Sequence, residues 1–590
     1  MNVRKRSGKV VPFDAEFISR AISLASAAAG EHDEEEIANI TQAVTDKLKA
    51  QGGEIWDIET IQDTVEETLF ETRHYQTAKA YIRYRLEKEK ERANAGSKEG
   101  LLTQEFLSPY KHAPSPMEQL GAFVYTRTYS RYLPKLGRRE FWWETVARAV
   151  EYNCSLAPTS REEAEKLYDN IYHMRQFLSG RTLWVGGTPV AEQYPMPNYN
   201  CAFTVIDSFS AYHDLFYLLM VGSGVGVRVL KSDAEKLPPV RTDLEILHKS
   251  YAPLSPEERL EYTDLTFSRD TATLSIGDSK EGWAQALTHY FDIITNREYR
   301  GIHRLVVVYD SIRPKGERLK TFGGTASGYG SMMTMIDKIH KVIAATGTRE
   351  GAVWVPLKPI DLLDIANIIG ENVVSGGVRR TSEIGLIDAD DETCIQAKSH
   401  LYRQVGGRWE IDKSIAHRQM SNNSIYYRKK PTREKLHWHL QQMRYSGEPG
   451  WINEEAGAKR RPNFNGCNPC GEILLDSHGL CNLTTLNVLG FVKDGVLDRK
   501  ALLEAQRLSA RAGYRMTCRE LEMHSWNAVQ QRDKLLGCSL TGWQDMVNAT
   551  KMSREEQIGL LEELRETAHK AAEDIAARLG GRVPLLVTTL

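Results

Sequence analysis

The chain has 590 residues, a formal net charge of −2, 41% hydrophobic residues and 26% charged residues. This composition is that of a folded globular protein, and it excludes wholesale disorder and a collagen-like structure. The 76 basic and 78 acidic residues nearly balance, so we expect no direct binding to nucleic acid or to an anionic membrane. At about 150 residues per domain, the length allows several domains, or one large enzyme barrel with an accessory domain.

No segment predicts a membrane span or an export signal. The most apolar stretch, residues 215–230, is interrupted by three glycines and Arg228, and a span needs about 20 apolar residues. The basic N-terminus, MNVRKRSGKV, is not followed by the apolar segment of a signal peptide. We therefore expect a cytoplasmic protein. Its eight cysteines are too few for a disulfide scaffold and are candidates for catalytic, redox or metal-binding roles.

Residues 1–95 predict a small, mainly helical domain. A short β ribbon around residues 10–13 precedes a helix that Asp14 can cap. Further helical spacing of apolar residues occurs over residues 34–50, from Asp57 onward, and over residues 75–94. The small, charged and proline residues of segment 93–115 then favour a domain boundary near residue 100.

The rest of the chain predicts an α/β fold. We assign residues 96–150 to a linker and N-terminal helices, and residues 151–590 to the main α/β domain. Strand-type segments such as 305–309 and 352–355 are separated by helical segments such as 362–369.

The last residues predict a strand without its neighbours. Ser553 and Glu556 form a capping box for a helix that stops at Gly580 and Gly581. The apolar run LLVTTL follows, and an apolar strand normally needs partners on both sides. We infer that the chain lacks the rest of its own fold.

The densest cysteine cluster lies in the segment FNGCNPCGEILLDSHGLCNLTTLNV. One interpretation is a structural zinc site, because Cys467, Cys470, His478 and Cys481 have the spacing C-x2-C-x7-H-x2-C. A second is a reactive sulfur at Cys470.

The second interpretation rests on alternation along an extended segment. Residues two apart point to the same side, so Asn468, Cys470 and Glu472 would present an amide, a sulfur and a carboxylate to one substrate. For an isolated N-x-C-x-E pattern, a packed thiol in a turn is the alternative.

Several segments resemble the catalytic subunits of ribonucleotide reductases. NPCGEI, followed by Cys481, resembles the finger loop of that family. The resemblance covers residues 100–590 through RQFLSGRTLWVGGTP, NYNCAF, VGSGVGV, GDSKEGW, IRPKGERLKTFGGTASG, NIIGENVVSGGVRR, SNNSI and GEPGWIN. NPCGEI and FGGTASG are most similar to the monomeric adenosylcobalamin-dependent (class II) ribonucleoside-triphosphate reductases. The resemblance implies a ten-stranded α/β barrel, incomplete at the C-terminus of this chain.

The same resemblance implies a catalytic set. Cys470 matches the residue that becomes a thiyl radical and takes the substrate 3′ hydrogen. Glu472 matches the general base for the 3′-hydroxyl, and Asn468 matches the amide that orients the ribose. Cys201 and Cys481 match the dithiol that supplies two electrons as the 2′-hydroxyl leaves as water.

Cofactor and partners also follow from the resemblance. Adenosylcobalamin is the implied radical source, although no D-x-H-x-x-G pattern is present, and the family binds it without that motif. A thioredoxin-like protein or a small dithiol is the implied reductant. Segment 232–282 resembles the insertion that replaces the dimer surface in monomeric class II enzymes, which favours a monomer. Diphosphate reduction with another radical source is an alternative.

Full-length relatives continue past the last residues with a phosphate-binding loop, and they end in a cysteine pair that re-reduces the active-site disulfide. We therefore expect a second polypeptide to supply these parts. The chain would then be half of a split enzyme, an extein-like piece or a truncation.

The segment VRKRSGKVVPFD resembles the start of an ATP-cone domain, a regulatory module for ATP or dATP. Val3, Lys5 and Arg6 would contact the nucleotide, with the basic side chains neutralising phosphate charge. A solvated basic terminus is the alternative.

Glycine-rich segments suggest nucleotide loops rather than a dinucleotide fold. VGSGVGV lacks the G-x-G-x-x-G spacing, so we expect close backbone packing beside the active site. Segment 323–330, together with Gly376, Gly377, Arg379 and Arg380, would form substrate or effector loops, or plain turns. A catalytically inactive nucleotide-sensing protein remains the second functional hypothesis.

Overall fold

The computed structural model describes residues 2–4, 10–31, 33–52, 55–82, 85, 100–133, 136–317, 325–375, 382–444 and 446–588. The chain divides into two units, Met1–Gly100 and Leu101–Leu590. Each unit has a hydrophobic core of its own. The division lies beside the boundary expected near residue 100, and the boundary expected at residue 150 stays a prediction.

Unit 1 packs helices against a small sheet in the order β2-β1-β3. Its elements are β1 (Asn2–Arg4), β2 (Val10–Pro12), α1 (Glu16–Ala29), α2 (Glu34–Gln51), β3 (Ile55–Asp57) and α3 (Ile58–Glu71). The Asp14 carboxylate accepts the Glu16 N–H at 2.9 Å, close to its expected capping position. Residues 75–82 are helical, and the expected extension to Asn94 lies partly outside the described residues.

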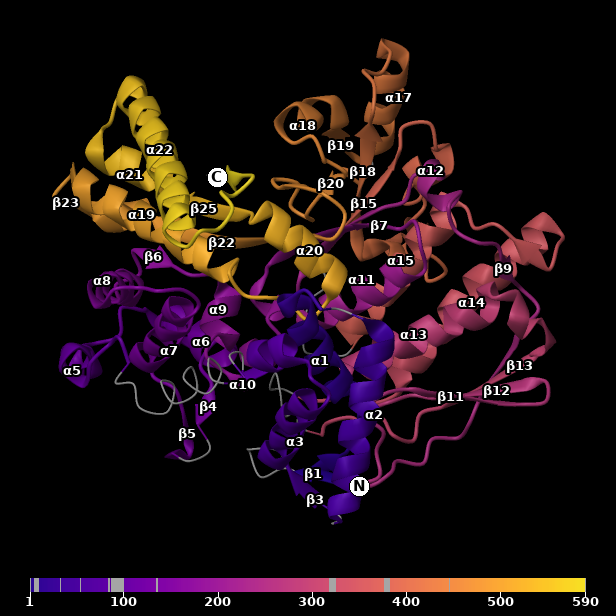
Figure 1. Cartoon of the computed structure of the whole chain (residues 1–590). Coiled ribbons are helices and arrows are strands. Elements are labelled where there is room, and N and C mark those ends of the chain that lie inside the picture. Colours follow the sequence, from indigo (N-terminus) through magenta and orange to yellow (C-terminus); the bar gives the residue numbers. More distant parts are fainter. Residues whose placement is uncertain are drawn as a thin grey trace. The chain divides into compact units, whose positions relative to one another are not determined.

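Unit 2 is built on a sheet in which the structure describes nine strands (Figure 1). Eight follow the order β19-β18-β15-β8-β7-β22-β25-β26, and β6 pairs with β22. In that order they are Gly450–Asn453, Ser421–Tyr427, Glu383–Asp388, Gly224–Arg228, Cys201–Val205, Gly479–Asn487, Leu536–Thr541 and Val587–Thr588, with β6 at Gln176–Phe177. This is the α/β sheet expected from the sequence.

The sheet has one internal antiparallel seam along its main path. Strands β19 to β7 are mutually parallel, and so are β22, β25 and β26, but β7 and β22 run antiparallel. Parallel neighbours need crossover connections, which helices provide. They are α11 (Ser210–Val221), α15 (Pro359–Ser375), α19 (Arg499–Met516) and α22 (Arg554–Arg578). Helix α19 contacts α22, β22 and β25 (Figure 1).

A second, four-stranded sheet follows the order β10-β13-β12-β11. Its strands are Glu245–His248, Arg304–Val308, Thr271–Ser275 and Asp264–Ser268. Helices α13 (Lys280–Thr295) and α14 (Gly330–Glu350) accompany it, and their apolar side chains belong to the main core. The expected strand at 305–309 is β13, and the expected helix at 362–369 lies within α15.

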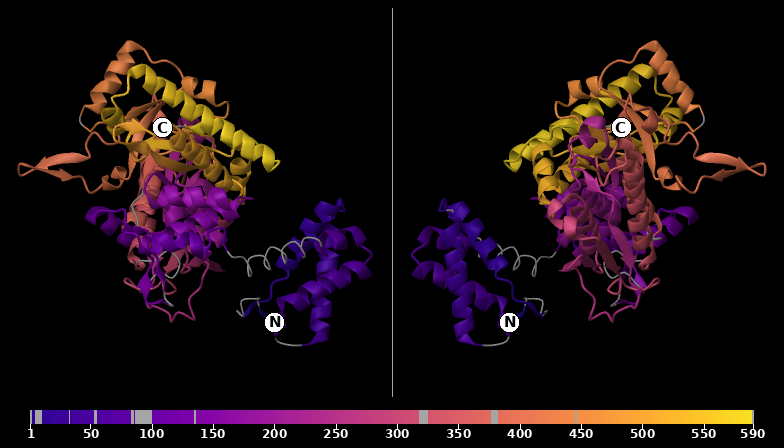
Figure 2. Two further views of the ribbon diagram at one scale, coloured as in Figure 1. Left: turned by 90° about the vertical axis from the view of Figure 1, so that its left-hand side faces the viewer. Right: turned by 90° about the vertical axis from the view of Figure 1, so that its right-hand side faces the viewer.

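Helices α5 (Gln104–His112), α6 (Gln119–Thr128), α7 (Trp142–Ser155) and α8 (Arg161–Tyr172) precede the sheet. A hairpin of β16 (Tyr402–Val405) and β17 (Arg408–Ile411) projects from unit 2 (Figure 2). Shorter elements are β4 (Tyr132–Leu133), β5 (Arg138–Arg139), α10 (Pro189–Gln193), α12 (Lys231–Ala234), β9 (Val240–Arg241), β14 (Trp354–Val355), α16 (Glu392–Ile395), α17 (Arg433–Met443), β23 (Val492–Lys493), β24 (Val496–Leu497), α20 (His524–Asp533) and α21 (Trp543–Thr550).

The C-terminal pattern forms as expected. Ser553 and Glu556 make the capping box of α22, and Val587 in β26 pairs with Leu536 of β25. In the part of the chain that the structure describes, we find no helix long and apolar enough to cross a membrane.

Candidate active site

Two cysteines face each other at the antiparallel seam of the main sheet. Cys201 begins β7, Cys481 lies in β22, and the two are register partners. Facing residues of an antiparallel pair have Cα atoms about 4.5–5.5 Å apart, which is within the range of a disulfide. Both thiols are free and buried. The seam therefore places them where a disulfide can form with little movement of the strands.

Both thiols hold their protons tightly. Burial raises the pKa of Cys201 to about 12, and a hydrogen bond from Asn468 acts in the opposite direction. Burial also raises the pKa of Cys481 well above its ordinary value, and the neighbouring Cys201 adds to this shift. At neutral pH the pair is a protonated dithiol, which is a store of two electrons and two protons.

A third cysteine lies on a loop between α18 (Glu454–Arg460) and β22. We call residues 463–478 the cysteine loop. Strands β20 (Gly466–Cys467) and β21 (Leu474–Leu475) pair antiparallel and form its stem. The tip is a turn in which the Gly471 N–H donates to the Asn468 carbonyl at 2.9 Å. Gly471 has a φ of +82°, a left-handed conformation that favours glycine.

The Asn468 side chain joins the loop tip to the dithiol. It is fully buried, and its Nδ2 donates to the Cys201 sulfur at 3.2 Å. Its Oδ1 accepts the Ile473 N–H at 3.0 Å, which closes the loop around the amide. A single side chain therefore fixes the position of the turn relative to Cys201.

Cys470 and Glu472 complete the cluster. Cys470 is exposed at the loop tip, whereas Glu472 is half-buried, and its Oε2 is buried without a hydrogen-bond partner in the structure. Burial raises the pKa of Cys470, and the Glu472 charge adds to this shift. The same charge contributes to the raised pKa values of Cys201, Cys467 and Cys481. The structure thus brings together the five residues that the sequence assigns to catalysis.

Glycines of the VGSGVGV segment allow the cysteine loop to lie against β8. A Cβ on Gly226 would meet the Cys467 carbonyl oxygen at 2.0 Å, and one on Gly224 would meet Pro469 at 3.2 Å. Such contacts admit only glycine at the tighter position. The close backbone packing expected for this segment is therefore confirmed.

The zinc interpretation does not fit the structure. Over the described ranges, which include Cys467, Cys470, His478 and Cys481, no group of three or more His, Cys, Asp or Glu side chains is arranged to hold a metal ion. His478 instead lies near Asp214, at 3.7 Å, and against the Trp526 ring. The four residues share a sequence pattern, but the fold turns them toward different neighbours.

A cation that no sequence motif indicated lies beside the dithiol. Arg181 lies in α9 (Gly180–Val185), donates to the Gly222 carbonyl, and its positive charge opposes the rise in the pKa of Cys201. Burial lowers the pKa of Arg181 itself. The sequence marked Arg181 only as the single charged residue in the segment LSGRTLWVGGTP.

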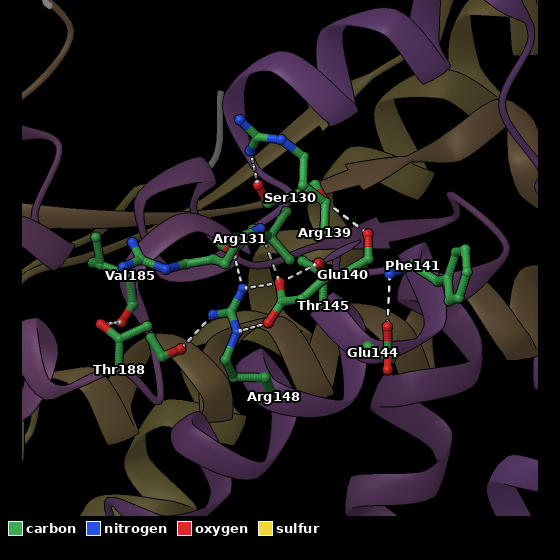
Figure 3. A network of polar contacts seen from close by, with 12 residues as sticks. Ser130, Arg131, Arg139, Glu140, Phe141, Glu144, Thr145, Arg148, Val185 and Thr188 are labelled. Carbon is green, nitrogen blue, oxygen red and sulfur yellow. Dashed lines mark hydrogen bonds and ion pairs between the residues drawn. The ribbon is translucent and has the colours of Figure 1, made fainter. Parts of the chain in front are cut away.

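Helix α9 is held in place by a buried polar network (Figure 3). Arg148 of α7 donates to the carbonyls of Gly186 at 2.5 Å and Leu183 at 3.0 Å. Its guanidinium also pairs with Glu140 at 2.7 and 2.8 Å, and Thr145 donates to the same carboxylate at 2.7 Å. The network ties the helices before the sheet to the wall of the site.

Most of the expected nucleotide contacts lie outside the described residues. These are Lys5, Arg6, Gly376, Gly377, Arg379 and Arg380. Val3 is described: it lies in β1, and its side chain is part of the core of unit 1.

A cavity of about 570 Å³ lies beside the described part of the expected loop segment 323–330. Its lining includes residues 327–331 and Lys315 on one side and Glu371 and Asn372 of α15 on the other. The rings of Tyr251 and Tyr329 stack at its edge with centroids 4.2 Å apart. The cavity combines a cation, hydroxyls and an aromatic face, which are the groups that bind a nucleotide.

Fold and site together define an α/β protein with a dithiol at a sheet seam and a loop-borne cysteine beside it. Family models match four parts of the chain: the ATP cone domain (residues 1–90), the ribonucleotide reductase alpha domain (102–188), the B12-dependent ribonucleotide reductase insertion domain (251–343) and the ribonucleotide reductase barrel domain (306–580). The chain belongs to the ribonucleotide reductase family. The insertion match extends well past the segment 232–282 expected from the sequence.

Curated relatives and a solved structure agree with this assignment. The adenosylcobalamin-dependent ribonucleoside-triphosphate reductase of Lacticaseibacillus paracasei is 31% identical over 502 residues, which cover 75% of this chain and 64% of the relative. The enzyme of the same name from Lactobacillus delbrueckii subsp. bulgaricus is 29% identical over 523 residues, which cover 80% of this chain and 67% of the relative. A crystal structure of a B12-dependent (class II) ribonucleotide reductase aligns with a TM-score of 0.70 and 26% sequence identity. The alignment covers 83% of this chain and 75% of the chain in that crystal structure.

The chain thus spans about two thirds of the length of these curated relatives, 64% for the first and 67% for the second. The comparisons give no support to a separate second polypeptide, which stays a prediction.

Proposed function

We propose that the protein reduces ribonucleotides to 2′-deoxyribonucleotides by thiyl-radical chemistry, with triphosphates as substrates. One observation carries the proposal: Cys201 faces Cys481 across the seam, and Asn468 ties the loop of Cys470 to that pair. A buried dithiol, a loop-borne thiol and a carboxylate in one cluster suit a reaction that needs a hydrogen acceptor, a base and a two-electron donor.

The proposed reaction assigns one task to each residue. The Cys470 thiyl radical takes the 3′ hydrogen of the ribose and becomes a thiol. Glu472 accepts the 3′-hydroxyl proton while one thiol of the Cys201–Cys481 pair protonates the 2′-hydroxyl, which leaves as water. The pair then gives a hydrogen atom to C2′ and one further electron to the sugar and becomes a disulfide, and Glu472 returns its proton to the 3′ oxygen. Cys470 finally returns its hydrogen to C3′, which restores the radical.

The chemistry of Cys470 fits a radical-generating cofactor. Its raised pKa keeps the sulfur protonated at neutral pH, so the S–H bond needed for hydrogen transfer is present. When bound, adenosylcobalamin supplies the organic radical that removes this hydrogen. Cys470 is the thiol of this cluster that a bound cofactor could reach, because it is exposed whereas Cys201, Cys467 and Cys481 are buried.

Regulation and location complete the proposal. The ATP cone binds ATP or dATP, with Val3, Lys5 and Arg6 as its predicted contacts, and the cavity beside Tyr329 takes a deoxynucleotide effector. Gly376, Gly377, Arg379 and Arg380 remain predicted loop contacts. A thioredoxin-like protein reduces the disulfide in the cytoplasm, where thiols stay reduced.

The test is deoxynucleotide formation from CTP and from CDP with dithiothreitol and adenosylcobalamin. It is run with this chain alone and with an added polypeptide that matches the remaining third of the relatives. Product from CTP in either mixture supports the proposal. Product from CDP but not from CTP would show that diphosphates are the substrates. Nucleotide binding without product in both mixtures would favour the nucleotide-sensing hypothesis.

A further inference from the structure

Charged side chains surround the stem of the cysteine loop, outside the catalytic cluster. Arg461, just before the loop, has a side-chain exposure of 0%, and its partner Asp533 has an exposure of 3%. The Arg461 guanidinium donates to Asp533 and to the carbonyl of Leu474 in the stem. One buried arginine thus ties the loop to the last residue of α20, which leads into β25.

Arg532 links Asp533 to the part of the cysteine loop that follows β21. Its Nε donates to Asp533 at 2.6 Å, and its Nη2 donates to the carboxylate of Asp476 at 2.6 Å. Asp476 lies within the cysteine loop, between its stem and β22. The same Asp533 also accepts the Leu585 N–H at its backbone carbonyl, at 2.8 Å, just before β26.

A second series of hydrogen bonds links Asp476 to β8 through Asn465. Asp476 Oδ1 accepts Asn465 Nδ2 at 2.7 Å and the Ser477 N–H at 2.8 Å. Arg228 donates to the Asn465 carbonyl at 3.1 Å and to its Oδ1 at 3.0 Å, and Asp233 fixes the Arg228 guanidinium at 2.9 and 3.0 Å.

We propose that Asp476 and Arg532 are positioning residues that hold the cysteine loop, and with it Cys470, in register with the dithiol. The contacts join the loop to β8 on one side of the seam and, on the other, to the end of α20, which leads into β25. The loop is held in addition by its stem pairing, by the glycine packing, by Ser477 Oγ, which accepts the Val205 N–H at 3.1 Å, and by the Asn468–Cys201 contact. The reaction assigned to Cys470 is sensitive to placement, because a shift of about 1 Å can cost roughly 100-fold in rate.

The inference rests on the proposed function only where it links the position of Cys470 to the rate of the reaction. The placement itself is tested without substrate or cofactor in the full chain. Asp476→Asn keeps Oδ1 as the acceptor for Asn465 and Ser477 but removes the charge that faces Arg532. Arg532→Gln removes the same ion pair from the other side, and Arg532→Lys keeps the positive charge.

Two readouts report the loop directly. In both neutral variants we expect the Ile473 amide, which bonds Asn468, to exchange hydrogen roughly tenfold faster, as expected for the loss of a coupling of about 1.4 kcal/mol. We also expect iodoacetamide to modify Cys201 faster, because the Asn468 contact loosens. Arg532→Lys should stay near wild type. Arg499→Gln, which breaks the exposed Arg499–Glu563 pair, is the matched control.

Unchanged Ile473 exchange and Cys201 alkylation in both neutral variants would overturn the proposal, whatever the activity of the enzyme. Equal changes in Arg499→Gln would do the same, because the effect would then be general destabilisation. If Asp476→Asn does not fold, the comparison of Arg532→Gln with Arg532→Lys decides. In the complete enzyme we expect kcat to fall roughly 100-fold at constant KM.

Discussion

At the residue scale, the cysteines differ in what their surroundings allow. Cys470 is exposed, Cys518 is partly exposed, and the other six are buried. Only Cys201 and Cys481 face each other across a strand pair, and only Cys470 shares a loop tip with Asn468 and Glu472. Chemical roles therefore follow from placement, since the residue type is the same.

Replacing Cys470 by serine tests the assigned radical site. We expect turnover to fall below detection while nucleotide binding stays within about twofold, because a hydroxyl does not give up its hydrogen atom to an organic radical as a thiol does. The measurement is deoxynucleotide formation beside equilibrium nucleotide binding. Cys518→Ser, outside the cluster, is the control and should retain activity. Turnover by Cys470→Ser would refute the assignment.

A buried thiol outside the site predicts the alkaline stability of the fold. Burial raises the pKa of Cys538 to about 12. When the pH rises above the unfolded pKa near 9, unfolded chains lose this proton while the folded thiol keeps it. The free energy of unfolding must therefore fall as pH rises toward 12, by about 1.4 kcal/mol per pH unit for this thiol.

Cys538→Ser removes that titration. We expect its stability, measured by urea unfolding between pH 8 and pH 10.5, to fall less steeply with pH than that of the wild type. Parallel curves for the two proteins would contradict the raised pKa. Cys154→Ser is a second variant of the same kind, because burial also raises the pKa of Cys154, to about 11.

At the element scale, β8 and the cysteine loop fit together through one glycine. Gly226→Ala places a methyl group 2.0 Å from the Cys467 carbonyl, so the loop or the strand must move. We expect a loss of roughly 1–3 kcal/mol in unfolding free energy and a loss of activity. Urea unfolding and the deoxynucleotide assay measure the two effects.

Gly559→Ala is the matched control for that substitution. Gly559 lies within α22, and a Cβ there meets nothing within 4 Å. Alanine is favoured over glycine in a helix interior, so we expect a gain of about 0.5–1 kcal/mol. Equal effects of the two substitutions would show that the contact at Gly226 has no role.

The polar network beside α9 joins two helices and contributes to the stability of the fold. Glu140 is 5% exposed and neutralises Arg148, which holds two carbonyls at the end of α9. Removing one partner of a buried ion pair leaves the other charge unpaired, at a cost of about 3–5 kcal/mol. We expect Glu140→Gln to approach this loss in urea unfolding, whereas Lys166→Gln, in an exposed pair, should change stability by under about 1 kcal/mol. A small effect at Glu140 would contradict the network.

At the scale of the whole molecule, the two units have separate cores and should unfold separately. We expect two transitions in scanning calorimetry. If unit 1 binds ATP as proposed, saturation at 100 times Kd should stabilise its transition by about 2.7 kcal/mol. A shift of the unit 2 transition alone would place ATP binding elsewhere. A single transition that ATP does not move would contradict both expectations.

Local patterns in the sequence were sufficient for much of the fold. Helical spacing and caps predicted α1, α3 and α22, because these signals depend on residues within a few positions of one another. The loop arrangement was accessible only through family resemblance, since N-x-C-x-E alone favours a packed thiol in a turn. The zinc interpretation failed because ligand spacing along the chain does not determine the direction of side chains.

The sequence by itself determined the α/β class, the helical first domain and the identity of the clustered cysteines. Only the tertiary structure decided that Cys201 and Cys481 are register partners, that Asn468 bonds the Cys201 sulfur, and that Arg181 and the Asp476–Arg532 pair lie around them. The physical reason is distance along the chain. Caps and helical faces arise from near neighbours, whereas strand register, burial and ion pairing join residues that only the packed core brings together.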